Sequence, residues 1–193
     1  MQTRISALLR ATAIVAAIGA GGYLATSHSF AKETTVEVGG APMYASKDII
    51  DNAVNSKDHT TLVAAVKAAG LVDTLKGKGP FTVFAPVDAA FAALPAGTVD
   101  TLLKPENKPA LRKVLTYHVV VGKLDSAALA KAVDAGGGKA TLTEVSGGTL
   151  TVTRSGSLLM LTDESGGMAH VTIPDVVQSN GVIHVVDKVL LPK

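Results

Sequence analysis

The period of the hydrophobic pattern changes once along the chain, and this change restricts the fold more than any other feature. Between residues 46 and 136, apolar residues recur at helical spacing, whereas the segments after residue 139 are short and extended. Helices followed by a run of antiparallel strands are typical of an α+β domain. The sequence therefore predicts one α+β domain.

The helical part contains short amphipathic segments with recognisable ends. We expect Ser46 and Asp58 to cap the first two helices, Gly70 to end the second, Asp88 to cap the third and Asp125 to cap the last. Pro109 suits the first turn of a later helix, in which Leu111, Val114, Leu115 and His118 share one face. The predicted helices cover residues 46–54, 58–70, 88–94, 97–103, 109–118 and 125–136.

Extended segments between turn residues are expected to form the sheet. Residues 80–86 are a strand bounded by prolines, and the last strand is apolar on both faces, which favours a central position. Turns rich in Gly and Ser separate the other strands. The predicted strands after the helices cover residues 140–145, 149–154, 158–162, 168–173 and 181–191.

Residues 1–31 have the organisation of a secretory signal peptide. Arg4 and Arg10 precede an apolar segment over residues 11–25, and Ser29-Phe30-Ala31 is a suitable cleavage site. The alternative is a membrane anchor, but fifteen apolar residues are fewer than the roughly 20 that a spanning helix needs. The sequence predicts export to the periplasm or the extracellular space, with no membrane span after cleavage.

The composition of the remaining chain excludes several classes of function. Without the two signal arginines, basic and acidic residues are equal in number, so nothing attracts nucleic acid or anionic lipid in general. The chain has no cysteine, which excludes disulfides, thiol chemistry and cysteine-based zinc sites. Residues 32–45 are predicted to be an extended arm with a short strand over 35–38, and residues 46–193 to be the domain.

Motifs for catalysis or cofactor binding are absent from the sequence. Gly122-Lys123 and Gly138-Lys139 lack the upstream glycine of a phosphate-binding loop, and no G-x-S-x-G or H-E-x-x-H motif occurs. Asp163-Glu164 lacks the spaced acids of a calcium loop, so a solvated turn is expected. The sequence predicts no cofactor and no metal.

The histidines after the signal segment are sorted by periodicity. We expect His59 to be exposed in the first turn of a helix, and His170 to lie on the wetter face of its strand. His184 lies between valines in the last strand, and His118 lies on the apolar face of its helix. Both are expected to be buried, neutral core residues, although a serine–histidine–acid arrangement stays open.

Three stretches together resemble the fasciclin domain. They are "PFTVFAPVDAAF" (80–91), "LTYHVVVGKL" (115–124) and "SNGVIHVVDKVLLP" (179–192), in the order and at the spacing of that family's two boxes and its Tyr-His motif. The resemblance extends from residue 46 to residue 192. One departure is Val87, where the family usually has a side chain that caps the following helix, so capping there would fall to Asp88.

The resemblance implies a fold and a function. The fold is an antiparallel β-wedge or sandwich flanked by several short helices. The function is that of a non-enzymatic, secreted module for cell-surface or matrix adhesion, which binds protein or polysaccharide. Two segments of the family are associated with partner binding, and the matching positions here are Tyr117, His118, Pro174, Asp175, Val176 and Val177. Of these, Asp175 is expected to be the exposed contact, whereas His118 points inward.

Two other functions are considered beside adhesion. Some fasciclin proteins bind carotenoids, and a chain rich in Ala, Val and Leu could carry an apolar small molecule. A core explains the same apolar content, so the carrier is the alternative. A hydrolase that uses His118 or His184 is the third hypothesis, and no motif supports it.

Overall fold

The computed structural model describes residue 33 and residues 35–193. The predicted signal peptide, residues 1–31, lies outside the described residues. The helices are short, as the sequence predicts, and none of those in the described part of the chain is long and apolar enough to cross a membrane. They are α1 (Ile49–Ala53), α2 (Thr60–Ala69), α3 (Val72–Leu75), α4 (Asp88–Ala92), α5 (Thr98–Leu102), the 3₁₀ helix η1 (Pro105–Asn107), α6 (Lys108–Tyr117) and α7 (Ser126–Ala135).

The strands form a hairpin and one large sheet. The hairpin pairs β1 (Thr35–Val38) with β2 (Ala41–Tyr44). The large sheet has the order β4-β3-β9-β8-β7-β6-β5. Its strands are β3 (Phe81–Pro86), β4 (Val119–Val121), β5 (Lys139–Thr143), β6 (Thr149–Ser155), β7 (Leu158–Thr162), β8 (Met168–Gln178) and β9 (Gly181–Val186).

The sheet is antiparallel except at its centre. β9 lies between β3 and β8 and runs parallel to β3, so the first and last strands of the large sheet are direct neighbours. The central position of β9 agrees with the sequence prediction. The parallel pairing was not predicted, because two strands that are apolar on both faces carry no signal of their relative direction.

The two ends of the sheet approach each other. Val120 in β4 forms an isolated antiparallel bridge with Glu144, the residue that follows β5. The backbone N–H of Val145 also donates to the carbonyl of Val119, at 2.8 Å. The sheet is therefore partly closed on itself, which reduces the free edge that β4 and β5 would otherwise expose.

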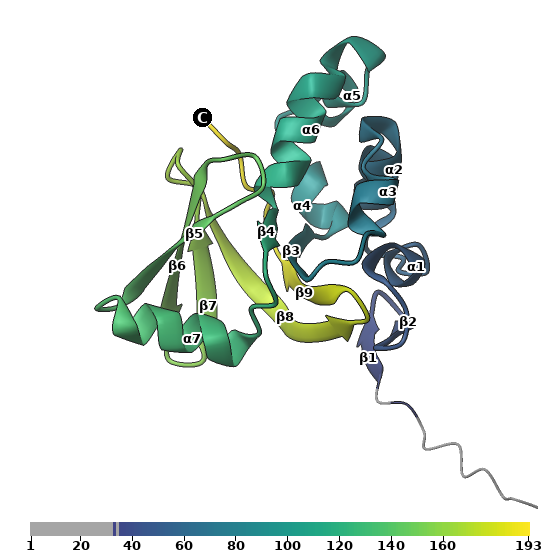
Figure 1. Cartoon of the computed structure of the whole chain (residues 1–193). Helices are drawn as coiled ribbons and strands as arrows, with labels where there is room; N and C mark the ends of the chain where they lie inside the picture. Colours follow the sequence, from purple (N-terminus) through teal and green to yellow (C-terminus); the bar gives the residue numbers. More distant parts are fainter. Residues whose placement is uncertain (1–32, 34) are drawn as a thin grey trace, which may run out of the picture. The chain divides into compact units, whose positions relative to one another are not determined.

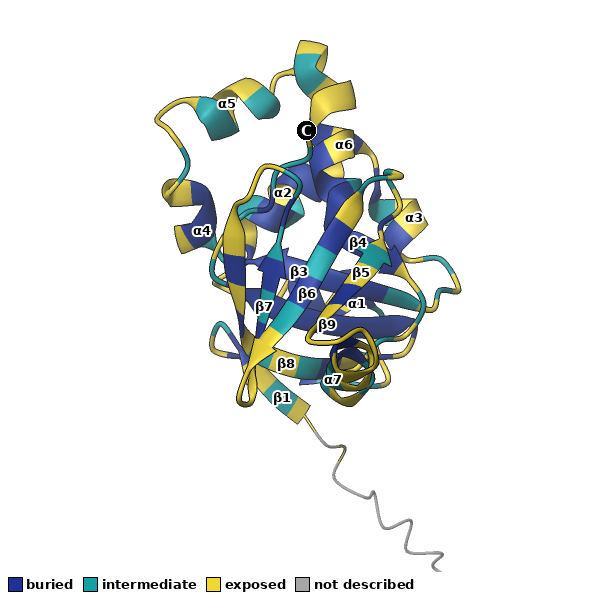
Figure 2. Cartoon of the chain, turned by 90° about the vertical axis from the view of Figure 1, so that its left-hand side faces the viewer, coloured by how far each residue is buried: buried dark blue, intermediate teal, exposed yellow. Residues whose placement is uncertain are grey.

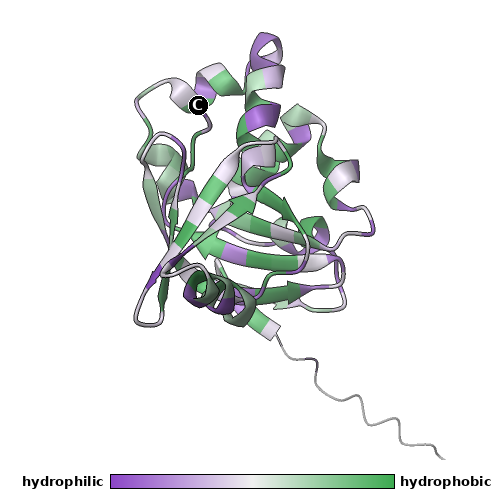
Figure 3. Cartoon of the chain, turned by 60° about the vertical axis from the view of Figure 1, so that its left-hand side comes forward, coloured by the Kyte–Doolittle hydropathy of each residue, from purple (hydrophilic) through white to green (hydrophobic). Residues whose placement is uncertain are grey.

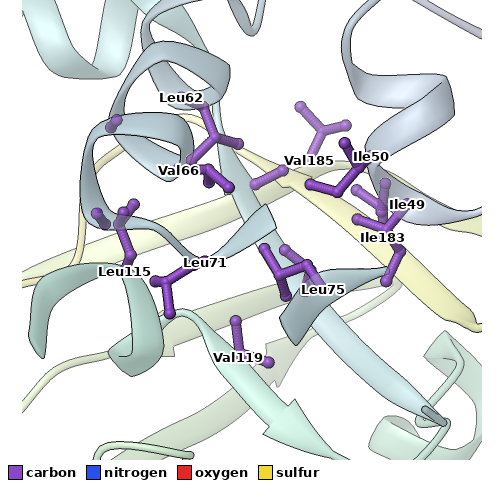
Figure 4. Packing of buried hydrophobic residues seen from close by; sticks show 14 of the residues in the cluster. Ile49, Ile50, Leu62, Val66, Leu71, Leu75, Leu115, Val119, Ile183 and Val185 are labelled. Carbon is purple, nitrogen blue, oxygen red and sulfur yellow. The ribbon is translucent and has the colours of Figure 1, made fainter. Parts of the chain in front are cut away.

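Two hydrophobic cores lie on opposite faces of β3 and β9. Val83 and Ile183 point into the first core, together with side chains from α1, α2, α3 and α6 (Figure 4). Phe84 and Val186 point into the second core, which β5–β8 and α7 complete. In Figure 1, α1–α6 lie on one side of these strands, and α7 lies on the other side with β5–β7. Since β9 contributes to both cores, all six of its residues are buried.

The N-terminal segment is folded rather than extended. The strand predicted over residues 35–38 is present, but β2 follows at once and closes a hairpin. Val38 and Met43 of this hairpin are 2% and 3% exposed and belong to the first core. Residues 35–44 therefore pack with the domain, and the expected arm does not stand apart from it.

Several helix ends differ from the prediction. The side chain of Asp48, not Ser46, caps α1 by accepting from the N–H of Asp51 at 2.8 Å. Asp125 caps α7, and Gly70 ends α2 in the left-handed conformation, as predicted. The residue before α4 is Val87, which makes no capping hydrogen bond. The sequence thus predicted the ends at Asp125 and Gly70 correctly and placed the cap of α1 two residues too early.

The outer face of β5–β8 carries the polar half of an alternating pattern. Along the strands that face the viewer in Figure 2, exposed and buried residues alternate. In Figure 3 the central strands are mostly hydrophobic, whereas hydrophilic residues concentrate in loops and helix surfaces. The outward side chains are mainly threonine: Thr141, Thr143, Thr149, Thr151, Thr153, Thr162 and Thr172.

Candidate functional site

His118 is buried at the end of α6, with both ring nitrogens occupied by backbone groups. Nδ1 donates to the carbonyl of Val114 at 2.8 Å, and Nε2 accepts from the backbone N–H of Leu190 at 3.0 Å. These two partners require a neutral imidazole with its proton on Nδ1. Burial lowers the pKa of His118 to about 4, and the Val114 carbonyl and Asp163 only partly oppose this. The ring therefore links α6 to the C-terminal segment, not to the strand that follows it.

Tyr117 has no exposed surface, and its hydroxyl is committed to two backbone groups. The hydroxyl donates to the carbonyl of Thr149 at 2.7 Å and accepts from the N–H of Glu164 at 3.1 Å. Burial raises the pKa of the Tyr117 hydroxyl above its ordinary value. Tyr117 thus joins α6 to β6 and to the turn before β8, and it cannot touch a partner in this conformation.

His184 has a similar environment in the middle of β9. Its Nε2 donates to the carbonyl of Leu124 at 2.8 Å, and its Nδ1 accepts from the backbone N–H of Asp175 at 3.3 Å. The ring stacks on Phe84, with centroids 5.6 Å apart. Burial lowers the pKa of His184. His184 is a neutral core residue, in the environment predicted from the sequence.

Phe84 connects His118 and His184. Its backbone N–H donates to the carbonyl of His118 at 2.9 Å, while its ring stacks on His184. Phe84 belongs to the first motif, His118 to the Tyr-His motif and His184 to the last motif. The three stretches that define the sequence signature therefore meet at one residue, through its backbone and its ring. Sequence reasoning missed Phe84, because a phenylalanine in an apolar strand carries no signal of its contacts.

The carboxylate of Asp175 is hydrogen-bonded within the fold. Its carboxylate accepts from the backbone N–H of Ser126 at 2.6 Å and from the Ser126 hydroxyl, so it holds the first residue of α7. Its backbone has a φ of 58°, and it lies within an irregular part of the β8–β9 pairing. Asp175 is therefore half-buried rather than exposed, because its carboxylate serves the N-terminus of a helix, and its role as a partner contact stays a prediction.

The neighbours of Asp175 differ in exposure. Pro174 is exposed, Val176 is buried in the first core, and the exposed fraction of Val177 is 37%. Of the six residues suggested by the resemblance, only Pro174 and Val177 offer substantial surface. No hydrogen bond links this segment directly to Tyr117 or His118.

Ser126, Asp175 and His184 are close together but do not form a catalytic triad. The serine hydroxyl donates to the Asp175 carboxylate, whereas His184 accepts from the Asp175 backbone N–H. A triad needs a histidine nitrogen that takes the proton of the serine and an acid that orients the other nitrogen. Here both ring nitrogens of His184 already have backbone partners. The same holds for His118, which leaves neither ring free to act as a base.

His59 and Asp163 are more buried than the sequence predicted. His59 precedes α2 as its N-cap, is 2% exposed, and contacts the Ser56 hydroxyl through Nδ1 at 2.9 Å. Asp163 accepts from the N–H groups of Ser165, Gly167 and Leu191, so its turn is tied to the C-terminal segment. His59 was expected to be exposed and Asp163 to lie in a solvated turn, but both side chains are buried. Within residue 33 and residues 35–193, no three His, Cys, Asp or Glu side chains are placed to hold a metal.

His170 lies on the exposed face of β8, as its strand periodicity predicts. Its Nδ1 is 3.0 Å from an oxygen of the Asp187 carboxylate, and its backbone N–H donates to the other oxygen at 2.7 Å. Among the described histidines it is the exposed one.

An apolar cavity of about 40 Å³ lies in the first core. Its walls include Met43, Leu62, Val66 and Ile183 (Figure 4 shows the surrounding packing). A single water requires roughly 10–15 Å³ measured in the same way, so this space admits only a few atoms. The cavity is a packing defect of the core in this conformation and has no room for a long polyene.

Comparisons with known proteins agree with the motifs. The model of the fasciclin domain family, described as "Fasciclin domain", matches residues 57–192. Protein sll1483 of Synechocystis sp. is 45% identical over 161 residues, which cover 83% of this chain and 82% of that protein. Immunogenic protein MPB70 of Mycobacterium bovis is 38% identical over 145 residues, 72% of this chain and 66% of that protein.

A solved structure shares the fold. It is a FAS1 domain pair from the insect cell adhesion molecule Fasciclin I, with a TM-score of 0.68 and 18% sequence identity. The match covers 75% of this chain and 51% of that chain, so this protein spans about half of the pair. The α+β fold with a large sheet and short helices is thus that of a known domain. Family model, relatives and fold agree, and the chain belongs to the fasciclin domain family.

Proposed function

We propose that the protein is a non-enzymatic, exported adhesion and interaction module that binds protein or polysaccharide at a cell surface or in a matrix. Membership of the fasciclin family supports this proposal, as does the fold that the chain shares with an insect cell adhesion molecule. The balance of basic and acidic residues outside the signal segment fits a partner other than nucleic acid.

The main support for the proposal is that the polar side chains of the family motifs are hydrogen-bonded inside the fold and hold it together. Both nitrogens of His118 and of His184, and the Tyr117 hydroxyl, are hydrogen-bonded to backbone groups, and each of the three side chains has at least one partner in another segment of the fold. Side chains with these partners hold segments together, and chemistry at them would require the fold to open. A rigid scaffold that presents a surface is what an interaction module needs.

We infer that Pro174 and Val177 provide direct contact with the partner. Both are exposed on β8, next to the hairpin β1–β2. Tyr117, His118, Asp175 and Val176 would then act indirectly, by fixing the segments that display this surface. This division assigns two kinds of role to the six residues suggested by the resemblance.

Attachment of cells or envelope vesicles to immobilised protein tests this proposal. The informative variant is Val177→Lys, and the matched control is Val54→Lys, because Val54 is 48% exposed at the end of α1. We expect Val177→Lys to lower attachment at least several-fold, with unchanged melting temperature, and Val54→Lys to have no effect. Equal attachment by both variants would exclude this surface, and no attachment by the unmodified protein would count against adhesion itself.

Export is part of the proposal. The predicted signal peptide places the mature N-terminus at Lys32, in the periplasm or outside the cell. Cell fractionation and N-terminal sequencing of the native protein test both points. A cytoplasmic protein with an intact Met1 would contradict them.

A carrier of an apolar small molecule, such as a carotenoid, is the second candidate. The apolar lining of the cavity in the first core favours it, whereas the volume of about 40 Å³ requires that core to open before a polyene could enter. Visible absorbance of the protein purified from its native host separates the candidates. A colourless preparation that takes up no added pigment would reject the carrier.

A further inference from the structure

Two methionines and one histidine share a small area on the outer face of β7 and β8. Met160 in β7 is paired in register with His170 in β8. Met168 precedes His170 by two residues on the same strand, so it lies on the same face of the sheet. The exposed fraction of Met168 is 54%, so its thioether is accessible from solvent.

The spacing of these positions allows the three side chains to converge. Cross-strand partners have Cβ atoms about 4.5–5.5 Å apart, and diagonal neighbours such as Met160 and Met168 about 7–8 Å apart. A methionine side chain is unbranched and flexible, with its sulfur two bonds beyond Cβ, so sulfurs from both positions can turn toward the His170 ring. Two thioether sulfurs can therefore approach the His170 ring from the neighbouring strand and from the same strand.

The His170 ring is already oriented as metal-binding rings are. Its Nδ1 donates to an Asp187 oxygen at 3.0 Å, and the other oxygen of that carboxylate is held by the His170 backbone N–H at 2.7 Å. A histidine ligand commonly donates its second nitrogen to a carboxylate, which fixes the tautomer and the ring orientation. The lone pair of Nε2 is then left for a ligand at the surface.

The set of donors selects for a soft, monovalent ion. Thioether sulfur and imidazole nitrogen suit Cu(I), whereas Ca²⁺ and Mg²⁺ require oxygen ligands and structural Zn²⁺ sites require more imidazole or thiolate. The nearest outward neighbours of the three residues are the uncharged Thr153, Thr162 and Thr172. The chain contains no cysteine, so no thiolate competes for such an ion.

We propose that Met160, Met168 and His170 form a surface site for Cu(I), with Asp187 as the residue that positions the imidazole. The site is independent of the adhesion function and lies on β7–β8, on a different part of β8 from Pro174 and Val177. No redox step is involved, because the ion binds and leaves as Cu(I).

Silver(I) is the first probe, since it has the same soft character and does not change oxidation state under these conditions. The protein is labelled at the methionine methyl groups and titrated with Ag(I) while the methyl resonances are followed by NMR. We expect the Met160 and Met168 signals to shift together and to saturate at one ion per chain. Met43 is 3% exposed in the first core and serves as the internal control that should not move. A shift of Met43 alone, or no shift at all, would overturn the proposal.

Competition with a chromogenic Cu(I) chelator under anaerobic, reducing conditions gives the affinity. Met160→Leu and Met168→Leu conserve volume, and we expect each to weaken binding at least ten-fold, as should His170→Ala. Asp187→Asn should weaken it about ten-fold, the effect of losing an orienting partner. The control Met43→Leu should bind as the unmodified protein does. Affinities that are unchanged in both Met160→Leu and Met168→Leu would refute the site.

Discussion

The carboxylate of Asp88, the first residue of α4, accepts a hydrogen bond from the backbone N–H of Thr61 at 2.8 Å and so caps α2. It also accepts from the N–H and the hydroxyl of Thr60. In return, the N–H of Asp88 donates to the carbonyl of Asp58 at 2.7 Å. Two helix starts that are almost thirty residues apart thus satisfy each other's free donors.

Asp88→Ala is expected to lower the free energy of unfolding by about 1 kcal/mol, because α2 loses its cap. Partial burial acts to raise the pKa of Asp88, but the hydrogen bonds from Thr60 and Thr61 outweigh it and the pKa lies below its ordinary value. Urea denaturation at pH 7 measures the effect. Asp58→Ala is the control, since the sequence alone names Asp58 as the cap, and a larger loss in that variant would contradict the structural assignment.

Stability should fall as the pH is lowered from about 6.5 towards 4, because His118 must stay neutral in the fold. Its pKa is lowered to about 4, so the unfolded chain binds a proton first and protonation favours unfolding. The contribution of neutral His118 to the free energy of unfolding is fully present above about pH 6.5 and is lost as the pH falls towards 4. Between pH 7 and pH 5 we expect a loss on the order of 2 kcal/mol from this residue.

The variant His118→Asn isolates this contribution. At pH 7 it should be less stable by about 1–3 kcal/mol, because Leu190 loses its buried acceptor and packing is altered. Its stability should also depend less steeply on pH between 7 and 5, and the remaining slope would come partly from His184, whose pKa is also lowered by burial. Parallel pH profiles for the two proteins would show that His118 is not the titrating group.

Gly181→Ala should destabilise the domain by about 3 kcal/mol or more, or prevent folding. A Cβ at residue 181 would lie against the backbone of Phe81, in the centre of the sheet, at less than van der Waals distance. The matched control is Gly156→Ala, where φ is +62° and no atom is close, so only about 1 kcal/mol of backbone strain is expected. Thermal unfolding of both variants checks the difference, and equal melting temperatures would argue against the close strand approach.

Asp175→Ala should lower stability by about 1–2 kcal/mol through the loss of contacts with Ser126, and Asp175→Asn by less, because one acceptor oxygen remains. Asp134→Ala is the control, because Asp134 lies on α7, the helix that begins at Ser126, and its ion pair with Arg154 is exposed. We expect a loss below about 0.5 kcal/mol there. A fall in partner binding without any change in stability would instead make Asp175 a contact residue.

Features that depend on near neighbours could be predicted from the sequence. Asp125 and Gly70 act on groups within four residues, the strand alternation around His170 fixes the face that it occupies, and the apolar run around His184 predicts its burial. These interactions are decided by local geometry, so a single sequence contains them. The change of period likewise predicted the α+β class correctly.

Features that depend on distant residues could not be predicted. The Asp88 cap, the bond between His118 and Leu190 and the contact of Phe84 with His184 each join segments whose pairing is decided by tertiary packing. His59 was expected to be exposed because it was placed in the first turn of α2. It precedes that turn, with φ −126°, and so leaves the helical face and turns inward.

The parallel pairing of β3 with β9 has a consequence for synthesis of the protein. Neither hydrophobic core is complete without β9, and β9 is the last strand of the large sheet to be synthesised. A nascent chain that has released everything up to β8 still exposes the apolar faces of β3 to solvent or to a chaperone. The domain therefore reaches its native state only after β9 has left the ribosome, and a chain cut before β9 would be a substrate for proteases.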